Sequence, residues 1–188
     1  MTENHFSPRE AEEKFESTDS DEELLSYLEE LAPQIGWVVI YFNSLEDGVA
    51  QCIREAMLHD PYQDERMDVF LAEMMFAAKC RSLMHLYGQM IESAAIKFTQ
   101  AELNQLEERL LECATRRNDY AHADWIGLKK GAYVRVKTQS KKRGIIHRYK
   151  RFELSQVEAD ISFIESTRHA LDEFNERITD QLWGRESA

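Results

Sequence analysis

Residues 99–122 read TQAELNQLEERLLECATRRNDYAH, and this stretch decides the fold class. Thr99 and Glu102 have the spacing of a capping box, in which the two residues exchange side-chain to backbone hydrogen bonds at the start of a helix. Apolar residues then recur every three or four positions, the period of an α-helix with one buried face: Leu103, Leu106, Leu110, Leu111 and Ala114. Gly (7) and Pro (3) are scarce among the 188 residues, which favours a mostly helical chain because tight turns need both.

The same helical spacing occurs in four further segments, 22–31, 35–58, 64–93 and 155–183. Pro33 is expected to end the first of these or to open the second, and Ser155 with Glu158 forms a second capping box. Residues 132–152 differ, because apolar and polar residues alternate on both sides of the sequence SKKRG at 140–144, as is typical of a β-hairpin. We therefore expect an all-α protein: a helical bundle of about five helices with a basic two-stranded β-hairpin inserted before the last helix.

The domain organisation follows from length and composition. Residues 1–20 are predicted to form an acidic, disordered tail, and residues 21–188 a single helical domain with the insertion at about 132–152. No run of 18 apolar residues and no apolar signal segment occurs, so we expect no membrane contact and no secretion. The three cysteines are far apart and odd in number, which favours a cytoplasmic protein without disulfides. The sequence also lacks phosphate-loop, dinucleotide-binding, serine-hydrolase and zincin motifs, and we expect no cofactor and no metal.

Charge is distributed unevenly along the chain, whose formal net charge is −12. Residues 128–151 contain ten Lys or Arg and no Asp or Glu, so this segment carries +10 and the rest of the chain −22. Such segregation predicts contact with a polyanion, and we expect RNA to bind here. The predicted RNA-binding residues are Arg116, Lys129, Lys130, Arg135, Lys141, Lys142, Arg143 and Arg148. The alternative is that the lysine-rich turn only keeps a surface loop solvated.

Three residues at the end of the 99–122 helix have the chemistry to cleave RNA: Arg117, Asn118 and His122. An imidazole titrates near neutrality, so His122 is predicted to act as general base or acid. A guanidinium binds phosphate through its planar fork, so Arg117, helped by Arg116, is predicted to stabilise the charged phosphorane. Asn118 is predicted to position the phosphate or the imidazole. On a regular helix Arg117 and His122 are about 140° apart, so we expect a homodimer to bring two copies of the motif together.

This stretch resembles the signature of the HEPN superfamily (higher eukaryotes and prokaryotes nucleotide-binding), an Arg and a polar residue followed by His. Arg117-Asn118 supplies the start and His122 the end, with four residues between Arg and His. The resemblance implies an all-helical, commonly dimeric protein that acts as a metal-independent endoribonuclease in a toxin or phage-defence role, with an antitoxin or operon partner. Two alternatives stay open: a catalytically silent helical module that binds nucleotide, nucleic acid or a protein partner, and a helical adaptor whose acidic surface docks a basic protein.

Two other histidines, His59 and His85, lie in patterns that could also carry a function. Arg54 and His59 have the same spacing, but Glu55 follows the Arg and no basic residue adjoins it, so we interpret this pair as a chance match. His85 lies within the apolar spacing of the 64–93 segment, and we predict that it is a core histidine with its hydrogen bonds satisfied.

Overall fold

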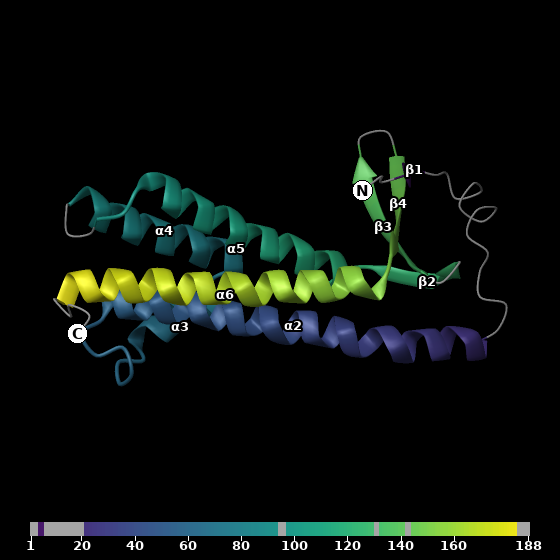
Figure 1. Cartoon of the computed structure of the whole chain (residues 1–188), viewed down its shortest axis with the longest axis horizontal. Coiled ribbons are helices and arrows are strands. Elements are labelled where there is room, and N and C mark those ends of the chain that lie inside the picture. Colours follow the sequence, from purple (N-terminus) through teal and green to yellow (C-terminus); the bar gives the residue numbers. More distant parts are fainter. Residues whose placement is uncertain (1–3, 6–20, 94–96, 130–131, 142–143, 184–188) are drawn as a thin grey trace. The chain divides into compact units, whose positions relative to one another are not determined.

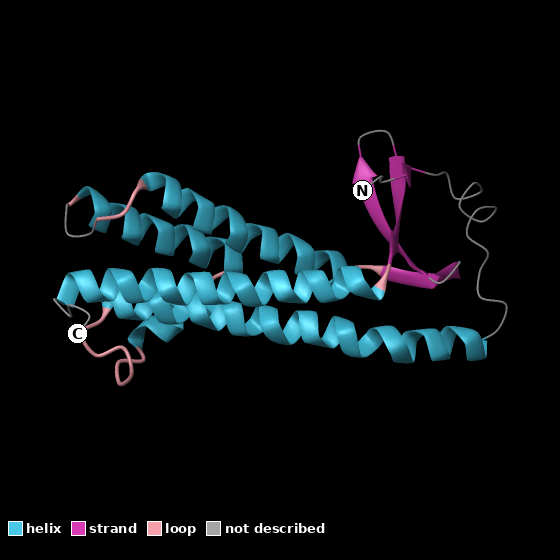
Figure 2. Ribbon diagram, viewed as in Figure 1, coloured by secondary structure: helices cyan, strands magenta, loops and turns pink. Residues whose placement is uncertain are grey.

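Helices make up most of the described part of the chain (Figure 1, Figure 2). This computed structural model describes residues 4–5, 21–93, 97–129, 132–141 and 144–183. The elements, in order, are β1 (Asn4–His5), α2 (Asp21–Met57), α3 (Arg66–Glu73), α4 (Phe76–Glu92), α5 (Gln100–Ala121), β2 (Asp124–Lys129), β3 (Ala132–Lys141), β4 (Gly144–Phe152) and α6 (Leu154–Trp183). Among the residues described, no helix combines the length and the apolar character that crossing a membrane requires.

Tertiary contacts divide the chain into two compact units. The first unit comprises Met1–Val39 and Arg117–Ile161, and the second comprises Ile40–Arg116 and Ser162–Ala188. Helices α2, α5 and α6 therefore contribute residues to both. Among the side chains that the structure describes in the first unit, the buried apolar ones are Tyr27, Leu31, Val38, Tyr120, Phe152 and Val157. Those of the second unit include Phe42, Leu45, Leu83, Tyr87, Leu110 and Leu171.

Polar contacts between helices accompany the apolar core of the second unit. The Lys79 Nζ of α4 forms an ion pair with the Glu46 Oε1 of α2 at 2.7 Å. The Tyr87 hydroxyl donates to Asn175 Oδ1 at 2.7 Å, and Asn175 Nδ2 in turn donates to Glu55 Oε2 at 2.6 Å. This chain of hydrogen bonds joins α4, α6 and α2, and it satisfies polar atoms that would otherwise be costly to bury. The second unit is a helical bundle in which these polar contacts fix the positions of α2, α4 and α6 along one another.

The predicted start of α5 is confirmed. The backbone N–H of Thr99 donates to Glu102 Oε2 at 2.9 Å, and the backbone N–H of Glu102 donates to Thr99 Oγ1 at 3.3 Å. Both halves of the capping box are therefore formed. The Thr99 N–H and hydroxyl, which donate to this carboxylate, lower the pKa of Glu102 below its usual range.

The prediction that Pro33 separates two helices is wrong, because α2 runs through it without a break. Proline inside a helix costs about 3 kcal/mol, since it lacks an N–H and its ring crowds the preceding turn. Here Pro33 is exposed, whereas Leu31 and Val38 on either side of it are fully buried. Burying each of these side chains contributes roughly 1.5–3 kcal/mol, which is enough to offset the cost of the proline.

The prediction of one helix over residues 64–93 is also wrong. α3 ends at Glu73, and Met74 and Met75 adopt extended backbone angles before α4 begins at Phe76. No Gly or Pro marks this break in the sequence. The break allows Leu71 and Phe76 to be buried together, with the ring of Phe76 4.7 Å from that of Phe42 in α2. The described residues form five helices, which is the expected number, because two errors cancel. The predicted break at Pro33 does not occur, and a break at Met74 and Met75 was not predicted.

The last helix begins one residue before the capping box that the sequence indicated. α6 starts at Leu154, and the backbone N–H of Gln156 donates to the carbonyl of Glu153 at 2.9 Å. Ser155 therefore lies in the first turn of α6 and not at its cap, and that prediction is wrong by one position. The apolar spacing that follows agrees with the buried face of the helix: Val157, Ile164, Leu171, Phe174 and Ile178.

The strands form one sheet with the order β1-β4-β3-β2 (Figure 1). β3 and β4 pair antiparallel from Tyr133–Phe152 to Lys141–Gly144. The insertion that we expected as two strands is therefore part of a sheet of four strands, as far as the structure describes it. β2 was missed because the six residues DWIGLK contain a Gly and only a short alternating pattern. Of the tail at 1–20, only Asn4–His5 are described, and they pair with β4; the rest lies outside the described residues.

Candidate functional site

Tyr120 anchors the last turn of α5. Its side chain is 2% exposed, and its hydroxyl donates a 2.6 Å hydrogen bond to Asp160 Oδ2, which is also buried. The ring stacks on Trp125 of β2 with 6.3 Å between centroids, and it tilts against Phe152 of β4 at 5.5 Å. A buried phenol that is bonded to a carboxylate and packed against two rings fixes the direction in which this turn presents its other side chains.

Asn118 and His122 lie on the solvent side of the same turn, and both are exposed. Successive residues of a helix differ by about 100°, so both point away from the side on which Tyr120 is buried. The backbone N–H of His122 donates to the carbonyl of Asn118 at 3.3 Å, which extends the helical pattern one residue past α5. The imidazole is therefore accessible and stands on an ordered support.

Arg117 is half-buried, and its Nη1 donates to Asn118 Oδ1 at 3.0 Å. The structure thus brings two of the three predicted catalytic residues into contact. His122 is separated from Arg117 by five positions, which on a regular helix corresponds to about 140°. Helix geometry therefore places the two residues of a single copy on different sides of the helix.

Arg116 has contacts of its own in the second unit. Its Nε forms an ion pair with Glu112 Oε1 at 2.9 Å, and its guanidinium lies 3.9 Å from the centre of the Phe163 ring. Its side chain is 28% exposed. A guanidinium over an aromatic face is stabilised by a cation–π interaction, and Arg also packs through its apolar stem. These contacts give Arg116 a structural role, which the sequence did not indicate.

The pairing of β3 with β4 gathers cationic residues on one face of the sheet. Arg135 lies opposite Lys150, and Lys137 lies opposite Arg148. Directly paired residues share a face, and so do residues two apart on a strand. The register therefore places four cationic residues on one face of the sheet, in two cross-strand pairs. We call Arg135, Lys137, Arg148 and Lys150 the cationic face.

Arg135 and Arg148 of the cationic face are among the RNA-binding residues predicted from the sequence, whereas Lys137 and Lys150 are not. The residue types and their alternation were visible in the sequence. Which residues face each other depends on the register, and this was unknown. Of the other predicted RNA-binding residues, Lys141 shares the face of Arg135 and Lys137 but lies at the strand end, opposite Gly144. Lys129 pairs with Ala132 on the opposite face, and Lys130, Lys142 and Arg143 lie outside the described residues.

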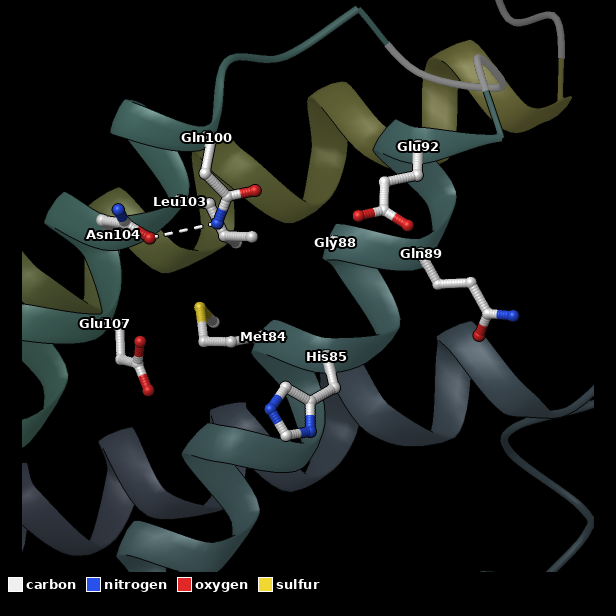
Figure 3. Close-up of a pocket in the computed structure, with 9 residues that line it drawn as sticks. All are labelled: Met84, His85, Gly88, Gln89, Glu92, Gln100, Leu103, Asn104 and Glu107. Atoms are coloured by element: carbon white, nitrogen blue, oxygen red, sulfur yellow. Dashed lines mark hydrogen bonds between the residues drawn. The ribbon is translucent and has the colours of Figure 1, made fainter.

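The prediction that His85 is a core residue is wrong. His85 is exposed, and it lines a pocket of about 470 Å³ between α4 and α5 (Figure 3). The pocket also presents the carboxylates of Glu92 and Glu107, and Figure 3 shows the imidazole on the side of Glu107. The other residues that line it are Met84, Gly88, Gln89, Gln100, Leu103 and Asn104. The physical reason is that α4 buries a narrower face than its apolar content suggested, formed by Cys80, Leu83, Met84 and Tyr87.

The second Arg–His pair in the sequence has a structural explanation. Arg54 Nε forms an ion pair with Asp68 Oδ1 at 2.7 Å, and Arg54 Nη1 donates to Gln51 Oε1 at 3.0 Å. His59 lies beyond the end of α2 and is exposed. Arg54 therefore links α2 to α3, which fits the interpretation of this spacing as a chance match.

No family model, curated protein or solved structure matches this chain. Within the described ranges, no group of three or more His, Cys, Asp or Glu side chains is placed to hold a metal ion. What the end of α5 can do chemically follows from its own residues. An exposed imidazole can accept or donate a proton near neutral pH, and a guanidinium with a neighbouring amide can bind a phosphate and offset its charge.

Proposed function

We propose that this chain is a HEPN-type endoribonuclease of the cytoplasm that cuts single-stranded RNA without a metal ion, in a toxin or phage-defence role. The observation that carries the proposal is the end of α5. There an exposed His122 and an exposed Asn118 stand on a turn anchored by Tyr120, and Arg117 is bonded to Asn118. One ordered turn thus carries both an acid–base group and a phosphate-binding group, and two copies of it would supply what cleavage of a phosphodiester requires.

RNA binding is supported by the cationic face. Arg135, Lys137, Arg148 and Lys150 alternate along two paired strands, whose neighbours lie about 4.8 Å apart. Two rows of cations at that spacing follow a phosphate backbone without reading its sequence. The segment that contains them carries +10, so it attracts RNA although the whole chain carries −12. An antitoxin or operon partner of the proposed toxin would have to block this face or the end of α5.

In the proposed reaction, His122 takes the proton of a ribose 2′-hydroxyl while the 2′-oxygen attacks the adjacent phosphorus. The bond between phosphorus and the 5′-oxygen breaks, and the leaving oxygen takes a proton from water. Arg117 offsets the charge that develops on the phosphorane, and Asn118 holds that guanidinium in place. The products are a 2′,3′-cyclic phosphate and a 5′-hydroxyl end.

The test compares His122→Ala with His59→Ala, since both histidines follow an Arg at the same spacing and both are exposed. On a single-stranded RNA in buffer with EDTA, His122→Ala should lower the cleavage rate by about 10²–10⁴, the usual contribution of a positioned proton-transfer group. His59→Ala should cleave like the wild type. Circular dichroism should show the same helical content in both variants, because neither side chain is buried.

Two further variants examine the arginine. Arg117→Ala should abolish cleavage, and Arg117→Lys should restore little of it because an ammonium keeps the charge but loses the planar fork. Cleavage that survives His122→Ala would place the chemistry elsewhere in the chain. Wild-type protein that binds RNA and leaves it intact would identify the silent binding module in place of the nuclease.

A further inference from the structure

Large apolar side chains are exposed on α3 and on the two segments that flank it. The structure describes eight large apolar residues that are strongly exposed, and five of them lie between positions 57 and 75. They are Met57, Tyr62, Val69, Phe70 and Met75, with exposed fractions from 53% to 82%. We call these five residues the α3 face. Single exposed apolar residues are ordinary, but such a concentration marks interaction surfaces, and Met and aromatic residues are enriched in them.

The α3 face stands on a fixed support. Leu71 of α3 is 3% exposed and belongs to the core of the second unit, and Asp68 of α3 is bonded to Arg54 of α2. Asp64 accepts a hydrogen bond at 3.1 Å from the backbone N–H of Arg66, the first residue of α3, and also pairs with the Arg66 side chain. The exposed side chains of α3 are therefore presented by a docked helix, so that a partner would not have to order them.

The charge around the α3 face selects its partner. Residues 57–75 contain five carboxylates, from Asp60, Asp64, Glu65, Asp68 and Glu73, against one guanidinium, which leaves −4. A two-fold contact between two copies of this face would set these carboxylates against their own copies, and like charges across an interface cost several kcal/mol. A partner that carries Lys or Arg around an apolar stripe complements the face in both respects.

A groove beside the α3 face provides room for a basic side chain. It has a volume of about 460 Å³ and lies between α2, α3 and the start of α4. Ala50, Leu71 and Ala72 line it with apolar atoms, and Glu46, Asp47 and Asp68 line it with carboxylates. Its two cations are already engaged, Arg54 with Asp68 and Lys79 with Glu46, and Asp47 is exposed. A long Lys or Arg side chain fits such a groove, because its stem is apolar and its head is charged.

We propose that the α3 face and its groove dock a basic amphipathic helix of another protein. The apolar stripe of that helix covers Val69, Phe70 and Met75, and its flanking Lys or Arg residues meet the acidic rim and Asp47. Helix-in-groove recognition of this kind uses apolar anchors at helical spacing and charges for orientation. The inference does not depend on RNA cleavage, since none of these residues belongs to the end of α5 or to the cationic face.

The experiment uses the full chain and an 18-residue synthetic peptide of Leu and Lys arranged as an amphipathic helix. Two comparison peptides are the same design with Glu in place of Lys, and a scrambled Leu–Lys sequence. Titration calorimetry at about 0.15 M salt should show binding of the amphipathic Leu–Lys peptide alone.

The variant Val69→Ser/Phe70→Ser/Met75→Ser should weaken that binding at least about tenfold, as loss of anchors in an interface does. Glu65→Gln/Glu73→Gln/Asp47→Asn should weaken it and flatten its salt dependence.

The matched controls lie on α2, away from α3 in sequence. Leu25→Ser/Ile40→Ser removes two apolar side chains that are 60% and 55% exposed, and Glu29→Gln/Glu30→Gln removes two exposed carboxylates. Both should bind the peptide like the wild type. The proposal is overturned if the peptide does not bind, if the scrambled sequence binds equally well, or if the controls weaken binding as much as the α3 variants. It is also overturned if the α3 variant converts a dimer to a monomer in sedimentation, because the occupant is then a second copy.

Discussion

Tyr120 is the residue on which the geometry of the candidate site depends. It lies between Asn118 and His122 in sequence, yet it is the one of the three that is buried. Its hydroxyl reaches Asp160 of α6, and its ring contacts β2 and β4. One side chain thus ties the turn that carries the proposed catalytic groups to three other elements of the first unit.

Replacing Tyr120 by Phe should lower the free energy of unfolding by about 1.5–3 kcal/mol, the usual contribution of a hydrogen bond to a charged group. The ring and its packing remain, so the loss reports the bond to Asp160. Urea unfolding followed by circular dichroism measures it. Tyr62→Phe is the matched control, because that side chain is 81% exposed. Loss of its hydroxyl should change the free energy of unfolding by less than about 0.5 kcal/mol. Equal effects of the two variants would show that the bond to Asp160 contributes nothing.

The buried thiols make stability sensitive to alkaline pH. Burial, with Glu107 and Glu46 nearby, raises the pKa of Cys80 from 9.0 to about 12, and burial raises that of Cys52 to about 11. A raised pKa in the folded state means that the native thiol keeps its proton when the unfolded thiol has lost it. The stabilisation is fully present below pH 9 and is lost as the pH rises through the folded pKa, at roughly 1.4 kcal/mol per unit for each thiol.

We therefore expect the free energy of unfolding of Cys80→Ala to fall less steeply than that of the wild type between pH 9 and 12. Leu83→Ala is the control, because it also removes a buried side chain of α4 but no titrating group. It should lower stability at every pH and leave the slope unchanged. If both variants keep the wild-type slope, the Cys80 thiol does not contribute to it.

At the scale of elements, the sheet is where pairing creates a property that neither strand has alone. β3 carries Arg135 and Lys137 on one face, and β4 brings Lys150 and Arg148 opposite them. Lys129 of β2 and Arg151 of β4 lie on the other face by the same register, because they pair with Ala132 and Val134. Both faces of the sheet therefore carry Lys and Arg, so variants of the two faces compare the effect of where a cation lies.

Replacing the four residues of the cationic face by Gln should weaken single-stranded RNA binding and reduce its salt dependence. Each lost phosphate contact lowers the slope of log affinity against log salt by ~0.7, so the full loss is about 2.8. Lys129→Gln/Arg151→Gln removes two cations from the other face and should change the slope little. Fluorescence anisotropy at several salt concentrations measures both. Equal loss per charge in the two variants would mean that net charge, and not the face, binds RNA.

At the scale of the whole molecule, the proposed chemistry requires a second subunit. On a regular helix Arg117 and His122 are about 140° apart. The two groups can therefore act on one phosphate only if another copy of the chain supplies one of them. We expect a homodimer of twice 22.0 kDa at micromolar concentration in sedimentation velocity. Mixing His122→Ala with Arg117→Ala should then restore part of the cleavage, since a mixed dimer keeps one intact pair across the interface. A monomer that cleaves RNA at the wild-type rate would contradict this expectation.

The sequence alone predicted those features that depend on local interactions. The mostly helical class, the capping box at Thr99 and Glu102, and the start of the helix that carries Arg117 and His122 follow from contacts within a few residues. The 140° between those two residues is likewise a property of any helix. The uneven distribution of charge along the chain can be counted from the sequence, because it does not depend on the fold.

Tertiary structure decided the rest, for the reason that burial outweighs local preference. Pro33 stays inside α2 because burying the apolar side chains around it stabilises the fold by more than the proline costs. The chain breaks at Met74 and Met75, although Met is a good helix former, because burial on both sides of the break stabilises the fold by more than helix propensity does. His85 became exposed because the buried face of α4 proved narrow. The pairing of Lys137 with Arg148 depends on register, which joins residues far apart in sequence, so no local pattern could determine it.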